Sequence, residues 1–486
     1  MKLKELLNHI PVLECTADPE LEINAVHYDS RKVTEGSLFV AVTGFASDGN
    51  RFIPMAMSKG AVAVVTAKKP EEDVPYILVE SDRLALALLG CNFYSHPAKA
   101  MTMIGVTGTN GKTSTTLLLK QVLEKVLGAK VGLIGTMANI IGDEEIPTER
   151  TTPESFDLQA LFDRMRDAGC SHVVMEVSSH AVTLERIGGT HFDIAAFTNL
   201  TEDHLDFHKT MDAYCDAKAD LFRRCDKAVI NLDDNYSDRI LAAAQCPVLT
   251  TSVAKDTGLH AQNLELLSEG ISFTAVCWEE TAEVHLPIPG KFTVYNALTV
   301  MGIAKQLGIS LADCAEALKT ATGVKGRVEV VPTPGMDYSV LIDYAHTPDG
   351  LENVLSSVKD FCKGRVIGVF GCGGDRDPMK RPIMGEIGVR LSDIAIITSD
   401  NPRTEEPMAI IEDILKGVKQ EFGEYIVMED RRAAIRYAMD IAKKDDIIVL
   451  AGKGHETYQE IHGVKYHLDE REEVAAHLQK LRNQNG

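Results

Sequence analysis

The chain has 486 residues and a formal net charge of −21, with the apolar and charged fractions of an ordinary globular protein. The length predicts about three domains, and the acidic balance argues against a general nucleic-acid or anionic-membrane binder. The ten cysteines lack metal-ligand spacing, and no segment has the pattern of a signal sequence or a membrane span. We therefore expect a cytoplasmic protein with reduced thiols that binds neither nucleic acid nor membrane.

The first 98 residues mix short apolar runs with one helical segment. Residues 36–42 and 61–65 read as strands, and residues 84–93 read as a helix. Tyr94-Ser95-His96-Pro97 ends this helix, because proline cannot continue it. Asp29-Ser30-Arg31 and residues 44–49 read, taken alone, as a turn and a loop. These features predict a first α/β domain over residues 1–98.

A glycine-rich loop follows the apolar run at residues 103–106. Its sequence is Thr107-Gly108-Thr109-Asn110-Gly111-Lys112-Thr113-Ser114, and residues 114–126 read as a helix. Backbone N–H groups of such a loop converge at a helix N-terminus, where the helix dipole favours an anion. The lysine suits the β- and γ-phosphates, and the threonine hydroxyl suits Mg²⁺. Val106 replaces the first glycine of the general pattern, and the alternative is a glycine turn that binds nothing.

Strands alternate with helices over residues 99–330, which predicts a central domain with a parallel sheet and right-handed crossovers. One apolar strand ends at Glu176, and ligands in such sheets sit at the carboxyl ends of strands. A carboxylate at this place suits Mg²⁺; the alternative is a buried glutamate satisfied by helix N–H groups. Thr152-Pro153-Glu154 reads as a helix start, with Pro153 at the first helical position.

A second polar cluster follows the predicted strand at residues 192–200. Two histidines, His204 among them, and three carboxylates lie within residues 202–208. Carboxylates favour Mg²⁺, with histidine as a minority ligand, whereas the cluster lacks the cysteine and the helical histidine spacing of zinc sites. Lys218 lies on an amphipathic helix, and periodicity allows both a surface position and a position in the site.

Residues 331–486 repeat the strand–helix alternation and predict a third, Rossmann-like α/β domain. Three of its strand ends carry polar loops, at residues 371–377, 399–403 and 451–456. Glycine turns are weak evidence singly, but three at one sheet edge predict a second ligand site. Arg376 and Arg403 suit a ligand with a carboxylate, because a guanidinium pairs with it through two hydrogen bonds. Read alone, Asp400-Asn401-Pro402-Arg403 is an Asx-type turn before a helix.

Together these motifs resemble the Mur ligase family, the ATP-dependent amide-forming enzymes of peptidoglycan assembly. The likeness follows the whole chain in order, and Thr107 to Thr113 matches the family's own form of the phosphate loop. The other matching motifs are Thr151-Thr152-Pro153, Glu176 to His180, Asn199-Leu200, Asp203-His204-Leu205-Asp206, Tyr295-Asn296-Ala297, Gly326-Arg327 and Asp343-Tyr344-Ala345-His346. The resemblance implies a small UDP-binding α/β domain, a central ATPase domain with a parallel sheet, and a C-terminal Rossmann-like domain for an amino acid.

The resemblance also implies roles for individual residues. Ser30, within Asp29-Ser30-Arg31, and the loop at 44–49 look like a uridine-diphosphate pocket. The implied muramoyl-peptide contacts are Thr151, Thr152, Ser178 and Arg186, with Leu184 standing where some members carry Gln. The implied ATP-binding residues are Gly108, Thr109, Asn110, Gly111, Lys112, Thr113, Ser114, Asn296, Arg327 and Asp343.

The implied metal and amino-acid sites complete the set. Thr113, Glu176, His204 and Lys218 resemble residues at Mg²⁺, with Lys218 carbamylated to N6-carboxylysine, and Lys112, Glu176, His204 and Lys218 form the implied catalytic set. Asp400-Asn401-Pro402-Arg403 matches the family's motif for meso-2,6-diaminopimelate, and Arg376, Gly452 and Glu456 fit the same pocket. Lysine-adding relatives lack an arginine at the last position of this motif. Diaminopimelate differs from lysine by one carboxylate, which Arg403 is suited to bind.

The implied reaction uses ATP and Mg²⁺ to join meso-diaminopimelate to the D-glutamate γ-carboxylate of UDP-N-acetylmuramoyl-L-alanyl-D-glutamate through an acyl phosphate. We expect a monomer that acts on these small molecules in peptidoglycan precursor synthesis. One alternative is a lysine-adding ligase of the same family. A folate polyglutamylating ligase is another, but it would need neither the first domain nor Arg403. A nucleotide-gated regulatory protein is the third, and the polar strand ends of the last domain argue against it.

Overall fold

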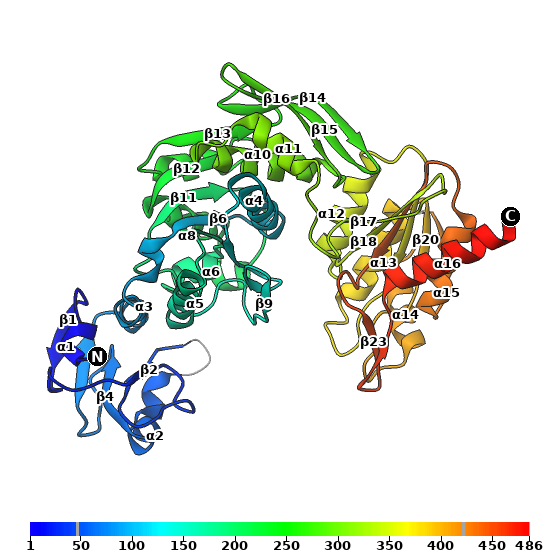
Figure 1. The fold of residues 1–486 in the computed structure, drawn as a ribbon. Helices are drawn as coiled ribbons and strands as arrows, with labels where there is room; N and C mark the ends of the chain where they lie inside the picture. Colours follow the sequence, from blue (N-terminus) through cyan, green and yellow to red (C-terminus); the bar gives the residue numbers. More distant parts are fainter. Residues whose placement is uncertain (45–47, 420–422, 486) are drawn as a thin grey trace. The chain divides into compact units, whose positions relative to one another are not determined.

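The computed structural model describes residues 1–44, 48–419 and 423–485. The chain divides into two compact units, residues 1–259 with 299–310 and residues 260–298 with 311–486, and each is described by itself. The predicted α/β class is confirmed, since parallel strands dominate three of the sheets (Figure 1). The three-domain boundaries near residues 98 and 330 stay a prediction. Of the predicted loop at 44–49, residues 45–47 lie outside the described residues.

The first part of unit 1 is a five-stranded sheet in the order β1-β5-β4-β3-β2. All neighbouring pairs are parallel except β1 with β5. Its inner face packs on α3, where Leu86 and Leu89 are buried. The elements are α1 (Leu3–Leu6), β1 (Val12–Cys15), β2 (Ala25–His27), β3 (Ser37–Val40), η1 (Gly49–Phe52), α2 (Ile53–Ser58), β4 (Ala61–Thr66), β5 (Tyr76–Val79), α3 (Asp82–Phe93) and η2 (Pro97–Ala100).

The rest of unit 1 is the predicted parallel sheet, with strands in the order β13-β12-β11-β6-β10-β7-β8-β9. The strands from β13 to β7 are parallel, and β8 and β9 add an antiparallel edge. The elements are β6 (Thr102–Thr107), α4 (Lys112–Leu127), β7 (Val131–Ile134), β8 (Asn139–Ile141), β9 (Glu144–Ile146), α5 (Ser155–Asp167), β10 (His172–Glu176), α6 (Ser179–Thr183), β11 (Phe192–Phe197), α7 (Leu205–His208), α8 (Met211–Ala219), η3 (Asp220–Arg223), β12 (Cys225–Asn231), α9 (Ser237–Ala243) and β13 (Val248–Ser252).

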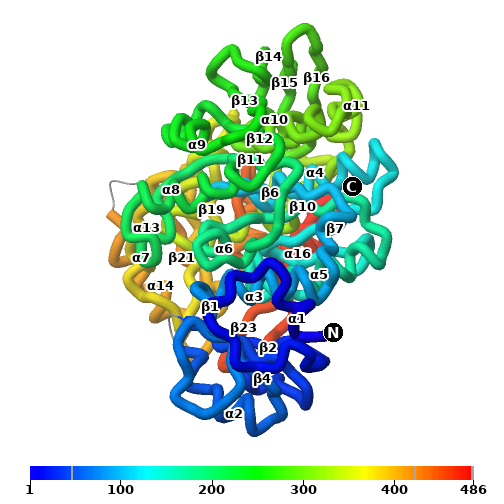
Figure 2. Tube along the Cα trace, turned by 90° about the vertical axis from the view of Figure 1, so that its left-hand side faces the viewer, coloured from blue at the N-terminus to red at the C-terminus, as the bar shows by residue number. Residues whose placement is uncertain are grey.

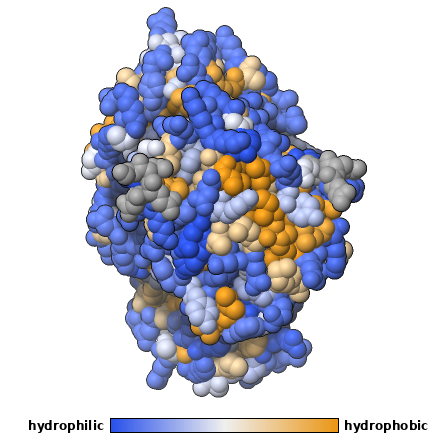
Figure 3. All heavy atoms as spheres, turned by 90° about the vertical axis from the view of Figure 1, so that its right-hand side faces the viewer, coloured by the Kyte–Doolittle hydropathy of each residue, from blue (hydrophilic) through white to orange (hydrophobic). Residues whose placement is uncertain are grey.

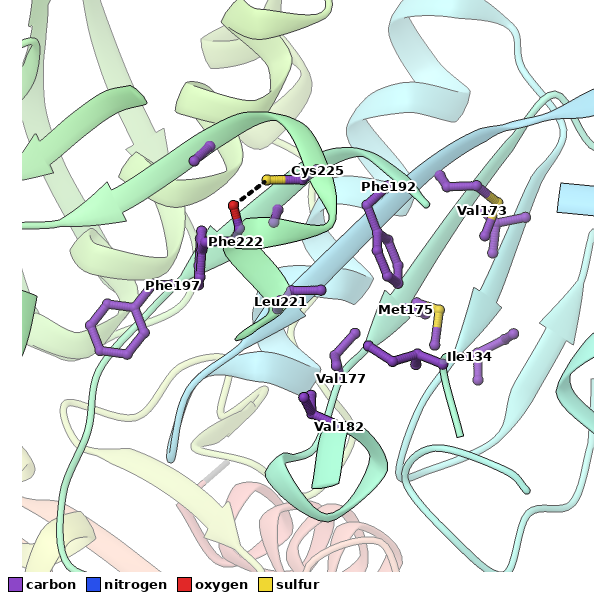
Figure 4. Packing of buried hydrophobic residues seen from close by; sticks show 14 of the residues in the cluster. Ile134, Val173, Met175, Val177, Val182, Phe192, Phe197, Leu221, Phe222 and Cys225 are labelled. Carbon is purple, nitrogen blue, oxygen red and sulfur yellow. Dashed lines mark hydrogen bonds between the residues drawn. The ribbon is translucent and has the colours of Figure 1, made fainter. Parts of the chain in front are cut away.

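The central strand β6 lies between β10 and β11, and their carboxyl ends meet at one edge. Glu176 pairs in register with Val106, and Phe197 pairs with Thr107. Next to this edge, a buried hydrophobic cluster packs on the sheet, and in it Phe192 lies near Met175 and Val177 (Figure 4). Any side chain at position 105 would collide with this ring, because a Cβ there would lie 2.9 Å from Phe192 Cε1. The close packing of Gly105 against Phe192 therefore fixes the position of the end of β6, from which the glycine-rich loop leaves the sheet.

Helix α5 begins later than the sequence predicts. Pro153 is not its first helical residue, because the helix starts at Ser155 and Glu154 is its N-cap. The Glu154 carboxylate accepts a hydrogen bond from Ser155 N at 3.2 Å, which stabilises this start. Helices α3 and α5 lie side by side, with the rings of Phe93 and Phe156 5.7 Å apart (Figure 2).

Unit 2 contains an antiparallel meander, β14-β15-β16, and a six-stranded sheet in the order β17-β18-β22-β19-β20-β21. The strands from β18 to β21 are parallel. The apolar runs predicted β18, β19, β20 and β22, whereas the edge strand β21 was not predicted. A two-stranded hairpin, β23-β24, follows β22. The elements from β14 onward are β14 (Leu259–Leu267), β15 (Gly270–Cys277), β16 (Glu280–Leu286), α10 (Lys291–Gln306), α11 (Leu311–Leu318), β17 (Glu329–Val331), β18 (Ser339–Asp343), α12 (Pro348–Lys359), β19 (Val366–Phe370), α13 (Lys380–Leu391), β20 (Ile394–Ile397), α14 (Pro407–Leu415), β21 (Glu424–Val427), α15 (Arg431–Ile441), β22 (Ile447–Ala451), β23 (Tyr458–Ile461), β24 (Val464–His467) and α16 (Glu470–Asn485).

The surface of unit 2 seen in Figure 3 is mainly hydrophilic, with an apolar area near its centre. Among the described residues, no helix combines the length and the apolar composition needed to cross a bilayer.

Candidate active site

The glycine-rich loop leaves β6 and closes at the first residue of α4. Gly108 and Gly111 have φ values of +154° and +85°, which suit glycine. A Cβ at position 108 would lie 1.9 Å from Thr198 Oγ1, so the loop also needs glycine for its close approach to β11. Thr113 and Ser114 lie in the first turn of α4, where backbone N–H groups point out of the helix. The predicted strand–loop–helix arrangement is confirmed.

The end of β11 holds this loop in place. Asn199 Oδ1 accepts from Asn110 N at 2.9 Å, and Asn199 O accepts from Thr109 N at 2.8 Å. Thr198 Oγ1 donates to Asn110 O at 2.7 Å. The sequence marked Asn199 only as part of a motif and gave Thr198 no role. Their signal is a Thr-Asn pair directly after a strand that ends in the apolar run Ile194 to Phe197.

Two lysine side chains converge on one carbonyl of the loop. Lys112 Nζ donates to Gly108 O and Thr109 O, both at 2.8 Å. Lys218 Nζ donates to the same Gly108 O at 2.7 Å and lies 4.5 Å from the Tyr214 ring centroid. Lys218 is only 1% exposed, which decides between the surface and the buried position. Burial first, and then the charge of Lys112, hold the pKa of Lys218 well below its usual value.

A lowered pKa favours the neutral amine of Lys218 over its ammonium form. A neutral amine can attack carbon dioxide: an N–C bond forms, a proton leaves to solvent, and a carbamate anion results. The anion would offset the positive charge of Lys112 beside it. The surroundings of Lys218 therefore suit carbamylation.

Glu176 is buried at the carboxyl end of β10, with 1% exposure. Its Oε1 accepts from Thr136 N at 2.9 Å, and its Oε2 accepts from Thr136 Oγ1 at 3.0 Å. Its partners thus come from the loop after β7, rather than from helix N–H groups. Thr136 Oγ1 also lies 3.0 Å from Thr151 Oγ1, so Thr136 joins Glu176 to the predicted muramoyl-peptide residues.

Those predicted residues lie together. Thr152 Oγ1 donates to Glu176 O at 2.8 Å and accepts from Ser178 N at 3.2 Å. Arg186 Nη1 donates to Thr152 O at 3.2 Å. Ser178 caps α6 by accepting from Ala181 N at 3.2 Å. The structure thus brings four of the five predicted contacts into one hydrogen-bonded group.

A buried carboxylate gathers positive charge next to this group. Glu154 Oε2 lies 3.5 Å from Arg186 Nε, 3.5 Å from Arg150 Nη1 and 3.8 Å from Arg83 Nη1. Burial, the largest influence, lowers the pKa of Arg186. Arg83 and Arg150 were missed by sequence reasoning: Arg83 meets Glu154 only in the folded chain, and the i,i+4 spacing of Arg150 and Glu154 was not considered. Three guanidinium groups around one carboxylate leave an excess of positive charge suited to an anionic ligand.

The fifth predicted contact, Ser30, lies after β2 in the five-stranded part of unit 1. It is buried, and its Oγ lies 3.4 Å from Met55 Sδ. In the same turn, the Arg31 guanidinium lowers the pKa of Asp29 to about 2. The Asp29 carboxylate therefore stays ionised and paired with Arg31 beside Ser30.

His204 is the N-cap of the short helix α7 and has a φ of +53°, and about half of its side chain is exposed. Its ring packs edge-on against His180, with centroids 4.9 Å apart. Among the residues described, no three His, Cys, Asp or Glu side chains are placed to hold a metal ion together. The polar cluster at 202–208 is thus no preformed metal site on its own.

The remaining predicted metal residues still suit Mg²⁺ by their donor chemistry. Thr113 offers a hydroxyl, Glu176 a carboxylate, and a carbamylated Lys218 an anionic oxygen. Mg²⁺ prefers oxygen and keeps waters and substrate phosphates in its shell, so it needs few protein ligands. A Mg²⁺ site of this kind does not need three His, Cys, Asp or Glu ligands from the protein, and the described side chains form no such group.

In unit 2, Asp343 ends β18 and is buried. Its Oδ2 accepts from Val328 N and its Oδ1 from Ala345 N, both at 2.8 Å. Burial, the largest influence, raises its pKa. Arg327 lies over the Tyr344 ring, 5.5 Å from its centroid. Asp343 thus fixes the segment that presents Arg327; Asn296, the other predicted nucleotide contact of this unit, is buried on α10.

The predicted amino-acid pocket forms at the carboxyl edge of the six-stranded sheet. The turn Asp400-Asn401-Pro402-Arg403 follows β20, and Arg403 Nη1 donates to Gly374 O at 2.8 Å, in the loop that carries Arg376. Arg403 has a φ of +53°, and its Nε lies 3.7 Å from Glu460 Oε2. Asn401 Nδ2 donates to Glu456 Oε2 at 2.8 Å. All three predicted strand-end loops therefore meet at one place.

The β23-β24 hairpin braces this turn, which the sequence did not predict. Arg403 N donates to Glu460 O at 3.0 Å, and Gln459 Nε2 donates to Asp400 O at 2.7 Å. Glu460 N donates to Asn401 Oδ1 at 2.9 Å. The hairpin holds the backbone and the amide of the turn, so the Arg403 side chain starts from a fixed position.

Gly452 provides a test of how tightly this pocket is built. Its φ is +118°, and a Cβ there would lie 2.5 Å from Asp400 Oδ2. We expect Gly452→Ala to raise the KM for the amino-acid substrate about tenfold or more, because Asp400 and its turn must shift. Steady-state kinetics with each substrate varied in turn measures this.

Gly463 in the β23-β24 turn is the matched control. It also has a positive φ, +75°, but a Cβ there would meet nothing within 4 Å. Gly463→Ala should cost about 1 kcal/mol of stability and leave KM unchanged. An equal KM effect in both variants would show that backbone strain, rather than the contact with Asp400, sets the result.

Three domain families match the chain. They are the Mur ligase family catalytic domain at residues 22–94, the Mur ligase middle domain at 106–304, and the Mur ligase glutamate ligase domain at 326–454. The matched segments contain the phosphate loop, Glu176, Lys218 and the Asp400–Arg403 turn. The domain that contains Gly452 extends to residue 454, just short of Glu456.

Similar full-length proteins are known. The UDP-N-acetylmuramoyl-L-alanyl-D-glutamate–2,6-diaminopimelate ligase of Clostridium botulinum is 48% identical over 466 residues, covering 95% of this chain and 96% of its own. Ligase 1 of the same name from Clostridium acetobutylicum is 47% identical over 485 residues, covering 99% and 100%. A solved structure of a ligase with this name has a TM-score of 0.78 and 31% identity, covering 99% of both chains. The chain belongs to the Mur ligase family.

Proposed function

We propose that this member of the family adds meso-2,6-diaminopimelate to the D-glutamate γ-carboxylate of UDP-N-acetylmuramoyl-L-alanyl-D-glutamate, with ATP as the energy source. The observation that carries the proposal is the Asp400–Arg403 turn: the Arg403 guanidinium is held at Gly374 O, and the Asn401 amide of the same turn donates to the carboxylate of Glu456. The distal end of diaminopimelate carries a carboxylate and an ammonium group. The carboxylate suits Arg403, and the ammonium group suits Glu456. The similar proteins named for this activity support it.

The phosphate loop supplies the other half of the reaction. A carboxylate resists attack by an amine, so it must first gain a leaving group. A γ-carboxylate oxygen attacks the γ-phosphorus of ATP, ADP leaves, and an acyl phosphate forms. The amine of diaminopimelate then attacks the acyl carbon, loses a proton, and expels phosphate. The protein contributes positioning and charge stabilisation.

Lys112 and the N-terminus of α4 stabilise the phosphate charge in this scheme. We assign Thr113, Glu176, His204 and a carbamylated Lys218 as the residues that would hold Mg²⁺. Bound there, Mg²⁺ would neutralise charge on the phosphates and on the attacking carboxylate. Glu176 is held for this role by Thr136, and Lys218 by the Gly108 carbonyl.

Thr151, Thr152, Ser178 and Arg186 would bind the muramoyl-peptide, and Ser30 the uridine-diphosphate part. Their support is the hydrogen-bonded group around Thr152 and the excess positive charge around Glu154. Gly108 to Ser114, Asn296, Arg327 and Asp343 would bind ATP. We also propose a monomer and a cytoplasmic location.

Arg376, Asp400, Asn401, Pro402, Arg403, Gly452 and Glu456 would bind diaminopimelate. The second candidate function is addition of L-lysine by the same chemistry. Arg403 argues against it, because a lysine side chain ends in an ammonium group without a carboxylate, so the guanidinium would face a like charge and have no anionic partner. A folate ligase is disfavoured because the first matched domain begins at residue 22 and precedes the phosphate loop.

Phosphate release from ATP tests the proposal against a nucleotide-gated switch. We expect release only when the UDP-muramoyl-dipeptide and diaminopimelate are both present, with a product mass equal to their sum minus one water. ATP hydrolysis that ignores both co-substrates would support a switch. Release that needs the dipeptide but an amine other than diaminopimelate would keep the ligase and change its substrate.

A further inference from the structure

Lys453 is buried at the centre of the amino-acid pocket, although no step of the reaction uses it. Its side chain has 0% exposure and lies in the loop directly after β22. Its Nζ donates to Asn401 Oδ1 at 3.0 Å and to Glu456 Oε2 at 3.3 Å, and it lies 3.5 Å from Asp400 Oδ1. A lysine carries three N–H donors, and three oxygens surround this one.

These contacts fix the orientation of the Asn401 amide. Asn401 Oδ1 faces two groups that can only donate, Lys453 Nζ and Glu460 N. The amide therefore turns its Nδ2 toward Glu456, where it donates to Oε2 at 2.8 Å. Without Lys453, one of the two constraints on this amide is lost.

The same contacts select one oxygen of Glu456. Asn401 Nδ2 and Lys453 Nζ both reach Oε2. The Glu456 side chain is 15% exposed, so part of the carboxylate faces outward. Within the described chain, Oε1 is therefore the oxygen offered to a ligand.

We propose that Lys453 is a positioning residue for amino-acid selection: it holds the Asn401 amide and the Glu456 carboxylate so that Glu456 Oε1 meets the ammonium group of the incoming amino acid. The inference rests on the proposed function, because it assigns Glu456 to that substrate. It predicts that Lys453 acts on the binding of one substrate through Glu456.

The test compares wild type with Lys453→Met, which keeps the length of the side chain and removes its donors. We expect the KM for diaminopimelate to rise at least about tenfold. The KM values for ATP and UDP-muramoyl-dipeptide, which bind elsewhere, should stay within about twofold. Lys465→Met is the control. Lys465 is an exposed lysine of the neighbouring hairpin, and both Lys453 and Lys465 lie over the Tyr458 ring, 5.7 and 4.1 Å from its centroid.

A double-mutant cycle with Glu456→Gln separates positioning from a general loss of structure. If Lys453 acts through Glu456, the KM increase of the double variant should be clearly smaller than the product of the single increases. The double variant also avoids a buried glutamate that has lost its lysine partner, which protects the test against misfolding. Thermal unfolding of each variant accompanies the kinetics.

The outcomes are distinct. An unchanged KM for diaminopimelate in Lys453→Met, or effects of the two substitutions that multiply fully, would overturn the positioning role and leave the proposed function intact. A parallel loss of activity that follows the fraction of unfolded protein, with all KM values unchanged, would also overturn it. Wild type that fails to use diaminopimelate would overturn the proposed function, and this inference with it.

Discussion

Lys218→Ala is expected to lower kcat about 10²- to 10³-fold, with little change in thermal stability. The substitution removes the side chain that, once carbamylated, would bring a negative charge to the metal site beside Lys112. Stability should hold because burying an amine with a strongly lowered pKa contributes little to folding. Phosphate release under saturating substrates measures the effect.

The dependence of activity on carbon dioxide tests whether Lys218 acts as a carbamate. Removing carbon dioxide and bicarbonate from the buffer should lower wild-type activity, and adding bicarbonate should restore it; the variant should respond to neither. Intact wild type should carry the mass of one added carbon dioxide, provided that the carbamate survives the measurement. Lys227→Ala, at an exposed lysine of β12, serves as the control. Full activity of Lys218→Ala would remove Lys218 from the metal site.

Arg403→Ala is expected to lower kcat/KM for diaminopimelate about 100-fold. The guanidinium would pair with the distal carboxylate through two charge-assisted hydrogen bonds, each roughly twice as strong as a neutral one. Activity with L-lysine, which lacks that carboxylate, should change much less. The selectivity for diaminopimelate over lysine should therefore fall by a similar factor.

Arg390→Ala is the matched control for this change. Arg390 lies on α13 and pairs with Glu352 at 2.9 Å on the surface, and its loss should leave kcat/KM unchanged. An Arg403→Ala variant that keeps its preference for diaminopimelate would assign the distal carboxylate to another residue, with Arg376 the first to examine.

The sequence predicted the parts of the site that local patterns encode. An apolar run followed by a glycine-rich loop and a helix marks a phosphate loop within a dozen residues. Polar loops after apolar strands marked Glu176 and Arg403, because parallel strands bring their carboxyl ends to one edge. The parallel sheets of both units follow from the same alternation of apolar runs and helices.

Long-range contacts could not be predicted in this way. Thr136 and Glu176 are 40 positions apart, and Lys218 and Gly108 are 110 apart. The amphipathic pattern around Lys218 left its burial open, and only the packing of α8 against the phosphate loop decides it. Lys453 lies in the predicted polar loop at residues 451–456 and was given no role, since its three partners come together only at the folded sheet edge.

The start of α5 shows how a local rule was overridden. Proline favours the first turn of a helix, but here the chain remains extended through Glu154, whose carboxylate caps the helix and also gathers three arginines. The helix therefore begins at Ser155, two residues after the predicted start at Pro153. No periodic pattern carries that information.

The most direct test of the central claim is the ratio of kcat/KM for meso-diaminopimelate to kcat/KM for L-lysine in the wild-type protein, with ATP and UDP-muramoyl-dipeptide saturating. A site built around a guanidinium for a carboxylate should favour diaminopimelate by about 10³-fold or more. A ratio near one, or a preference for lysine, would contradict the assignment of Arg403 and of the substrate.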